Sequence, residues 1–176
     1  ETVAEYTFAL MLSLVHRIPE ADRFTRSGAF EGWAPELFLG RNLRGMTLGI
    51  LGAGRIGQEV ARLSHAFGAA IVYTDVKRNE HLEKETGAQF ISELDDIFSK
   101  VDIISIHVPL LESTHHLVNR ERLSRMKDGS YLVNTSRGAV VDEKALVAVL
   151  KEGKIRAAAL DVFEHEPKLS PGLIEF

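Results

Sequence analysis

The sequence has 176 residues, enough for one sizeable hydrophobic core, and its length alone does not indicate two. A hydrophobic fraction of 45% and a charged fraction of 26% are typical of an ordinary globular domain. The formal net charge of −4 disfavours nucleic acids and anionic membranes as partners, because both attract basic surfaces. The chain contains no cysteine, which excludes disulfides and thiolate metal sites and is compatible with the cytoplasmic location that we expect.

The two ends of the chain do not look like natural termini. Glu1 leads directly into a helical pattern, and Phe176 follows a turn-like Ser-Pro-Gly. The sequence has no signal peptide and no apolar run of membrane-spanning length. We therefore expect the chain to be a fragment of a longer protein.

The first 45 residues are expected to divide into a helix and a loop. Residues 1–22 are predicted to form a buried or interfacial helix, because the stretch from Thr2 to Arg17 is rich in apolar residues. Residues 23–45 are predicted to form an irregular loop that wraps the surface, since they hold several residues that break helices. These residues are Gly28, Gly32, Pro35, Gly40 and Gly45.

From residue 46 to residue 176, short apolar runs alternate with amphipathic segments. The runs lack the apolar–polar alternation of a half-exposed sheet, so we expect fully buried strands at Leu48–Leu51, Ala70–Thr74, Asp102–Ile106, Ser130–Val133 and Arg156–Leu160. Helical spacing predicts helices at Ile56–Phe67, Glu93–Ser99, Glu121–Met126 and Asp142–Lys151, with Ser92 and Asp95 as a capping box. This alternation predicts an α/β fold with a doubly wound parallel sheet, which binds ligands beyond the carboxyl ends of its strands.

The segment LGILGAGRIG predicts a dinucleotide-binding loop. It places Gly52, Gly54 and Gly57 after a predicted strand and at the start of a predicted helix. In such loops the glycines provide a tight turn, close approach of the backbone to pyrophosphate, and close packing of helix on strand. The helix offers free N–H groups and its positive dipole end to the phosphates. Arg55 and Ile56 lie in the same turn and belong to the predicted site.

An acidic residue follows the second predicted strand at the expected place. Asp75 stands about 20 residues after the glycine loop, where a carboxylate can accept both hydroxyls of the adenosine ribose. Such a carboxylate repels a 2′-phosphate, so NAD is the predicted cofactor rather than NADP. Lys77 and Arg78 lie close by and weaken this preference, and an ordinary turn aspartate is the alternative interpretation.

Arg137 is unusual in the stretch VNTSRGAVVDE, because a turn after a strand does not need a guanidinium. It lies beyond the end of a predicted strand, at the edge where doubly wound sheets bind ligands. We therefore expect Arg137 to bind a ligand. A local ion pair with an acid such as Asp142 is the alternative.

Three strings, LRGMTLGILGAGRIGQEVA, MKDGSYLVNTSRGAVVDEKAL and IRAAALDVFEHEP, resemble the D-isomer-specific 2-hydroxyacid dehydrogenases. That family includes phosphoglycerate, D-lactate and glyoxylate/hydroxypyruvate enzymes. The resemblance covers essentially the whole chain and implies that residues 1–176 are a Rossmann-type NAD-binding domain. It implies that the parent protein is an oxidoreductase that transfers a hydride between NAD(H) and a small D-2-hydroxy acid or 2-oxo acid.

The resemblance also assigns roles to single residues. It implies that Arg137 clamps the substrate carboxylate and polarises its 2-oxo group, which a planar guanidinium fork suits. Glu166, before the proline of VFEHEP, would hydrogen-bond a histidine and raise its pKa. Glu164 is the rival carboxylate, and spacing alone does not separate the two. Cofactor contacts would come from Asp161 at the nicotinamide carboxamide, Thr135 and Ser136 beside the nicotinamide, and His107, Val108 and Pro109 near the adenosine.

The family's catalytic histidine lies in a PHxG-like string, which this sequence lacks. His165 neighbours Glu166 and is expected to point away from it. We therefore expect this chain to bind cofactor and to catalyse little or nothing. The pair His115-His116 suggests a metal, but adjacent side chains diverge and no carboxylate stands at ligand spacing, so no metal site is predicted.

We expect a homodimer, because the opening helix is too apolar to be solvated and, in the family, this element packs against the other subunit. The predicted interface is this helix together with residues 23–45. The alternative function is an NAD-sensing dimeric scaffold related to the transcriptional co-repressors of the same family, which keep the same arginine and glutamate. A domain without any ligand would leave Arg137, Asp75 and Asp161 at the strand ends unexplained.

Overall fold

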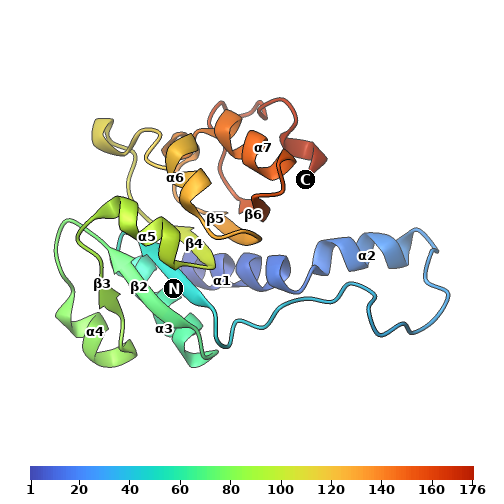
Figure 1. Ribbon diagram of the computed structural model, residues 1–176, viewed down its shortest axis with the longest axis horizontal. Coiled ribbons are helices and arrows are strands. Elements are labelled where there is room, and N and C mark those ends of the chain that lie inside the picture. Colours follow the sequence, from blue (N-terminus) through green and yellow to red (C-terminus); the bar gives the residue numbers. More distant parts are fainter.

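The computed structural model describes residues 1–176 and contains a six-stranded, wholly parallel sheet (Figure 1). The strand order is β3-β2-β1-β4-β5-β6, so the chain winds outward from β1 in one direction and then from β4 in the other. The strands are β1 Thr47–Leu51, β2 Ala70–Thr74, β3 Gln89–Phe90, β4 Ile103–Ile106, β5 Ser130–Asn134 and β6 Ile155–Leu160. The doubly wound parallel sheet predicted from the sequence is confirmed.

Helices cover both faces of the sheet. Residues of α1, α3 and α4 contribute to a cluster of 19 buried residues on one face, and residues of α5, α6 and α7 to a cluster of 20 on the other. The helices are α1 Thr2–Val15, α2 Ile18–Arg26, α3 Arg55–Ala66, α4 Glu80–Thr86, α5 Leu94–Lys100, α6 Arg120–Arg125 and α7 Glu143–Lys151, with 3₁₀ turns η1 Glu112–Thr114, η2 Gly138–Val140 and η3 Leu173–Glu175.

The two clusters explain why the strands read as continuous apolar runs. Neighbouring residues of a strand point to opposite faces, and along β1, β4 and β5 both faces are buried. The full burial predicted for Arg156–Leu160 is wrong, because β6 lies at the edge of the sheet and only its Ile155 is buried. In β4, Ile103 belongs to the α1 side and Ile104 to the α5 side, and both are fully buried. Gly49 of β1 makes room for Ile104, because a Cβ there would stand 2.9 Å from its Cδ1.

Each strand and helix that was predicted between residues 46 and 176 forms, with ends shifted by at most one residue. The short elements β3 and α4 were not predicted. Asn79 caps α4 by accepting a hydrogen bond from the Leu82 N–H at 3.0 Å. The capping box predicted at Ser92 is wrong, since α5 starts after Glu93 and has no side-chain cap.

Helix α1 packs on its own domain. Ala4, Phe8, Met11 and Val15 are buried in the cluster that also holds residues of β1, β2 and α3. The apolar character that suggested a subunit interface is therefore satisfied within the chain. The helix ends before Arg17, whose φ of 57° breaks the path into a second helix, α2.

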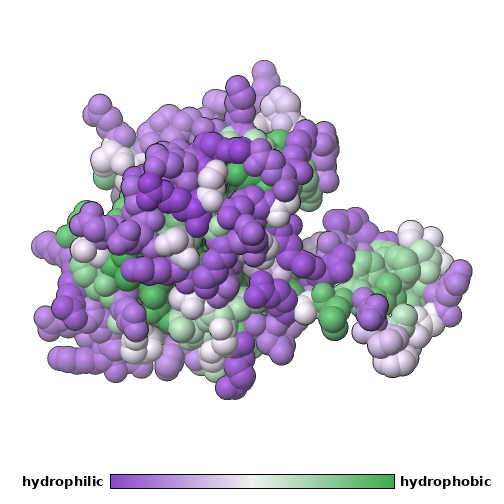
Figure 2. Space-filling model, viewed as in Figure 1, coloured by the Kyte–Doolittle hydropathy of each residue, from purple (hydrophilic) through white to green (hydrophobic).

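Helix α2 and the loop to residue 46 project from the body as an arm (Figure 1). The predicted boundary at residue 22 thus falls inside α2, and the loop begins later than expected. The arm exposes large apolar side chains, including Trp33 at 85% and Leu39 at 67%, and Figure 2 shows an apolar surface over it. None of the helices in the structure is long and apolar enough to cross a membrane.

Candidate functional site

The predicted site residues come together because the strands are parallel and in register. Leu51, the last residue of β1, pairs with Thr74 of β2 and with Ile106 of β4. Ile106 pairs with Asn134 of β5, which pairs with Leu160 of β6. The residues that follow these ends therefore lie along one edge of the sheet: Gly52, Asp75, His107, Thr135 and Asp161.

The glycine loop lies between β1 and α3, next to the point where the strand order reverses. Gly52 has a φ of +94°, and a Cβ there would stand 2.9 Å from the His107 carbonyl carbon. A Cβ on Gly57 would collide with the carbonyl oxygen of Gly52, so this glycine holds α3 close to the strand. Gly54 has no atom within 4 Å of its Cβ position, so its surroundings are open. Its backbone is thus accessible to a phosphate, as the motif requires.

Asp75 lies directly against the glycine loop. Its Oδ2 accepts a hydrogen bond from the Ala53 N–H at 2.7 Å, and its Oδ1 accepts one from the Val76 N–H at 2.6 Å. Each carboxylate oxygen keeps a further lone pair for a ligand hydroxyl. The hydrogen bond to Ala53 therefore holds Asp75 against the glycine loop, although the two are about 20 residues apart in the sequence.

The neighbouring cation Arg78 is paired with an acidic residue. Its guanidinium lies 2.7 Å from the Glu83 carboxylate, and the same carboxylate accepts a hydrogen bond from the Tyr73 hydroxyl at 2.7 Å. These hydrogen bonds, first from Arg78 and then from Tyr73, lower the pKa of Glu83 to about 2. Lys77 is exposed, so Asp75 is the charge that faces the loop.

The segment His107–Pro109 forms the next part of the edge. His107 donates its backbone N–H to the Leu51 carbonyl at 2.7 Å, and its Nε2 lies 2.8 Å from the Ser105 hydroxyl. Burial lowers the pKa of His107 to about 4, so the imidazole is neutral at physiological pH. The Ser136 hydroxyl donates to the Val108 carbonyl at 2.5 Å, which joins the loops after β4 and β5.

Helix α1 contributes to the site, which the sequence did not indicate. The hydroxyl of Thr7 lies 2.7 Å from that of Thr135. The pKa of the Tyr6 phenol is raised, mainly by the negative charge of Asp161. A hydrogen bond between the phenol and the Asp161 carboxylate acts in the same direction. Residues 1–3 line a cavity of about 740 Å³ together with Gly54 to Ile56 and His107. Because α1 lies some 45 residues from the glycine loop, no local pattern could have revealed this.

Arg137 lies beyond the end of β5, as predicted, and its side chain is exposed. Its guanidinium donates to the Ser136 carbonyl at 2.7 Å. Asp142, the alternative partner, caps α7 by accepting from the Ala145 N–H at 2.9 Å. Arg137 therefore has no acidic partner, and its guanidinium is exposed at the strand end where the predicted nicotinamide position lies.

The two rival glutamates occupy different surroundings. Glu166 is exposed and accepts a hydrogen bond from the Phe163 N–H at 2.9 Å. Glu164 is turned away to His116, with its Oε1 2.7 Å from the Nε2 atom. Its Oε2 accepts from the first N–H of α7, that of Glu143, at 3.3 Å. Of the two carboxylates, only Glu166 is free of a side-chain partner.

Gly138 brings the loops of Arg137 and Glu166 together. A Cβ on residue 138 would collide with the backbone of Phe163 and Glu164. The two backbones thus touch, and Arg137 is the neighbour of a residue that packs against the turn whose Phe163 N–H holds Glu166.

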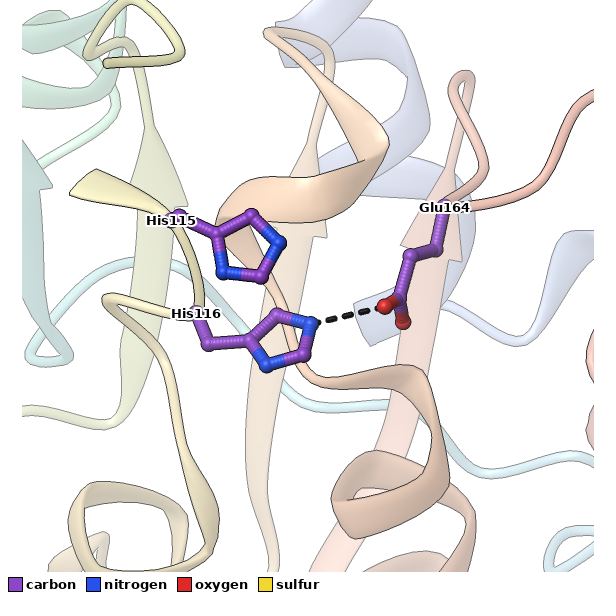
Figure 3. A group of neighbouring side chains, drawn as sticks. All are labelled: His115, His116 and Glu164. Carbon is purple, nitrogen blue, oxygen red and sulfur yellow. Dashed lines mark hydrogen bonds and ion pairs between the residues drawn. The ribbon is translucent and has the colours of Figure 1, made fainter. Parts of the chain in front are cut away.

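The predicted divergence of His115 and His116 is wrong. Their rings stack with centroids 4.1 Å apart, and Glu164 supplies the carboxylate that the sequence spacing did not reveal (Figure 3). All three donors lie within 4.8 Å of one another. The reasons for expecting no metal site therefore do not hold.

Comparison with known proteins identifies the domain. The sequence profile described as "D-isomer specific 2-hydroxyacid dehydrogenase, NAD binding domain" matches residues 8–175. The chain belongs to this family. Its resemblance to the family, inferred above from three strings, is thus confirmed, and so is NAD as the cofactor of the domain.

Relatives within the family include oxidoreductases of several names. The chain is 51% identical over 171 residues to a glyoxylate reductase of Aeropyrum pernix, covering 95% of this chain and 51% of that protein. It is 44% identical over 191 residues to the peroxisomal glycerate dehydrogenase of Arabidopsis thaliana, covering 99% of this chain and 50% of that protein. The chain spans about half the length of the curated relatives it matches.

The fold is also that of solved dehydrogenases. A crystal structure of D-lactate dehydrogenase from Aquifex aeolicus, complexed with NAD and lactic acid, superposes with a TM-score of 0.88 at 40% identity. That match covers 99% of this chain and 54% of the other. A glyoxylate reductase from Paecilomyes thermophila gives a TM-score of 0.89 at 39% identity, covering 99% of this chain and 52% of the other.

Proposed function

We propose that this domain serves a dehydrogenase that transfers a hydride between NAD(H) and a small D-2-hydroxy acid or 2-oxo acid. The observation that carries the proposal is the exposed Arg137 beyond the end of β5, at the sheet edge that also holds the glycine loop, with Gly138 packed against the turn that bears Glu166. Relatives named glyoxylate reductase, glycerate dehydrogenase and D-lactate dehydrogenase act on acids of this class.

The cofactor would lie along the strand ends. The pyrophosphate would meet the open backbone at Gly54 and the N-terminus of α3, and the adenosine ribose would meet Asp75. The loop of His107 to Pro109 would flank the adenosine half. The nicotinamide would lie beyond β5 and β6, with Thr135 and Ser136 beside it and Asp161 at its carboxamide.

The substrate would be held by charge and bidentate geometry. Arg137 would bind its carboxylate through two parallel N–H donors, and the same positive charge would polarise the 2-oxo group. When NADH is bound, it supplies the hydride. Glu166 would hold a histidine in its protonated form, and that imidazolium would donate a proton to the forming alkoxide.

We infer that none of the seven histidines of this chain is that proton donor. His116 is held by Glu164, and His165 lies 3.8 Å from Glu164 rather than beside Glu166. His107 is buried against Ser105 at the edge assigned to the adenosine. We therefore propose that this chain binds NADH without turning over 2-oxo acids.

We also propose a homodimer, with the arm as the contact surface. Because Phe8, Met11 and Val15 of α1 already pack on their own domain, we assign the contact to the exposed apolar side chains of α2 and residues 27–45. Their density on one projecting segment favours a protein partner, because single domains rarely expose large contiguous apolar patches.

The test is a titration of the chain with NADH and NADPH, followed by assays with glyoxylate, hydroxypyruvate and pyruvate. We expect binding of NADH in preference to NADPH, and no turnover. In the full-length protein we expect turnover, and Arg137→Lys should lower kcat/KM by about 10- to 100-fold, the worth of a charge-assisted hydrogen bond. Turnover by this chain alone would refute the proposal that it lacks the catalytic histidine. NADH-dependent self-association of the full-length protein without turnover would favour the scaffold function.

A further inference from the structure

We propose that His115, His116 and Glu164 bind a divalent transition-metal cation of the zinc type. This site is independent of the proposed dehydrogenase function, because none of the three residues belongs to the cofactor or substrate positions. Two imidazoles and one carboxylate with an open fourth position form a known zinc donor set. Figure 3 shows both rings facing the Glu164 carboxylate from one side.

The backbone holds the two histidines in an uncommon arrangement. His116 has a φ of +48°, in the left-handed region that few residues other than glycine adopt. Its N–H is fixed to the Ala139 carbonyl at 2.8 Å. In extended backbone, adjacent side chains point to opposite sides. The left-handed residue instead lets the two rings stack, so two neighbouring residues present donors to one point.

The carboxylate is fixed from behind. The buried Glu143 carboxylate accepts from the Glu164 N–H at 2.8 Å, and the Glu143 N–H donates to Oε2 of Glu164. The Ser170 hydroxyl holds the other oxygen of Glu143. These contacts orient Glu164 before any cation arrives, as supporting hydrogen bonds do in metal sites.

The distances require only small movements. In a tetrahedral zinc site with metal–ligand bonds of about 2.0–2.1 Å, donor atoms stand roughly 3.4 Å apart. Here His116 Nε2 and Glu164 Oε1 are 2.7 Å apart, and all three donors lie within 4.8 Å. A cation would replace the proton between His116 and Glu164, with that proton moving to Nδ1 or solvent, and draw in the exposed His115.

The surroundings favour a cation and give it access. His116 and Glu164 line a cavity of about 620 Å³. Asp142 and Lys144 line the same cavity and carry opposite charges. With Glu164 added, the lining has a net negative charge. His165 also lines it, and together with water it is a candidate for the fourth position.

Calorimetric titration of the chelator-treated chain with Zn²⁺ tests the site. We expect one Zn²⁺ per chain. His115→Ala should weaken binding at least tenfold, since loss of even an outer partner of a metal ligand costs about that much. This variant leaves the His116–Glu164 hydrogen bond in place, so its melting temperature without metal should be unchanged. Glu164→Gln keeps an acceptor for His116 but removes the charge, and should weaken binding as strongly.

The control is His81→Ala, which removes an exposed histidine 3.2 Å from the single carboxylate of Glu85 on α4. We expect no change in Zn²⁺ affinity there. Co²⁺ as a probe should give the visible absorption of a tetrahedral site in the original chain and lose it in His115→Ala. The proposal fails if no Zn²⁺ binds, or if His115→Ala binds it as tightly as His81→Ala does.

Discussion

Three glycines of one loop have different physical roles at the scale of single residues. Gly57 fills a space that has no room for a methyl group, whereas Gly54 faces open space. Gly54 also has a φ of −71° and a ψ of −171°, which any residue adopts. Gly52, with its φ of +94°, is needed for the turn itself. The motif GxGxxG therefore combines two glycines needed for folding with a third that only a ligand would require.

Gly54→Ala and Gly57→Ala should separate these roles. For Gly54→Ala we expect a free energy of unfolding within about 0.5 kcal/mol of the original. NADH affinity should fall at least tenfold, because the methyl group occupies the approach of the pyrophosphate. Gly57→Ala should lower the free energy of unfolding by about 1–3 kcal/mol, the cost of overpacking. Urea unfolding and NADH titration measure both quantities, and a destabilised Gly54→Ala would contradict the assignment.

Asp75 provides a second test at this scale. Asp75→Asn keeps an oxygen for the Ala53 N–H but removes the negative charge. We expect NADH to bind about 10- to 100-fold more weakly, the value of a hydrogen bond to a charged group. The affinity for NADPH should fall less, because Asn does not repel the 2′-phosphate as the Asp75 carboxylate does. Asp128→Asn, on the exposed partner of Lys154, serves as the control and should leave both affinities unchanged.

At the scale of elements, the arm is the part of the chain with the least support from its own domain. The rings of Phe24 and Phe38 meet edge to face at 5.1 Å, and the Arg17 guanidinium lies 5.1 Å from the centre of the Phe38 ring. These contacts hold α2 against the following loop, whereas Trp33 and Leu39 stay exposed.

Trp33→Ser with Leu39→Ser should therefore weaken self-association. Truncation of a central aromatic contact costs an interface about 2 kcal/mol or more, which is roughly 30-fold in the dissociation constant. Sedimentation velocity at micromolar concentration should show a dimer for the original chain and a monomer for the double variant. Val76→Ser, at a residue 97% exposed beyond β2, should remain dimeric. A monomeric original chain would refute the dimer.

The elements that sequence reasoning found are those with a strong local signal. The inner strands β4 and β5 have apolar runs buried on both faces, and α3 and α7 have helical spacing with caps or glycines at their starts. β3 has only two residues, and α4 is mostly charged, so neither carries a pattern. The pairs Thr7–Thr135, Asp75–Ala53 and His116–Glu164 join distant segments, and only the fold brings them together.

At the scale of the whole molecule, the lowered pKa values of His107 and Glu83 make stability depend on pH. Burial lowers the pKa of His107 from 6.5 to about 4 in the folded chain. Between these values the unfolded chain binds more protons, so stability is complete above pH 6.5 and falls as the pH drops to 4. Glu83, with a pKa of about 2 instead of 4.5, adds a second loss between pH 4.5 and 2.

Urea unfolding at pH 7 and at pH 4.5 measures the first of these effects. His107 should account for a loss on the order of 3 kcal/mol over its full range. His107→Gln should flatten the dependence in this window, and His65→Gln, on the exposed end of α3, should not. A His107→Gln slope equal to the original would show that this imidazole is not the titrating group.

Residue 138 has a further consequence for the chain as a whole. The Phe163 carbonyl leaves room there for one hydrogen atom. The missing side chain of Gly138 therefore sets the spacing between the loop that bears Arg137 and the turn that bears Glu166. A larger side chain at residue 138 would force the backbone of Phe163 and Glu164 outward, and with it the turn that bears Glu166.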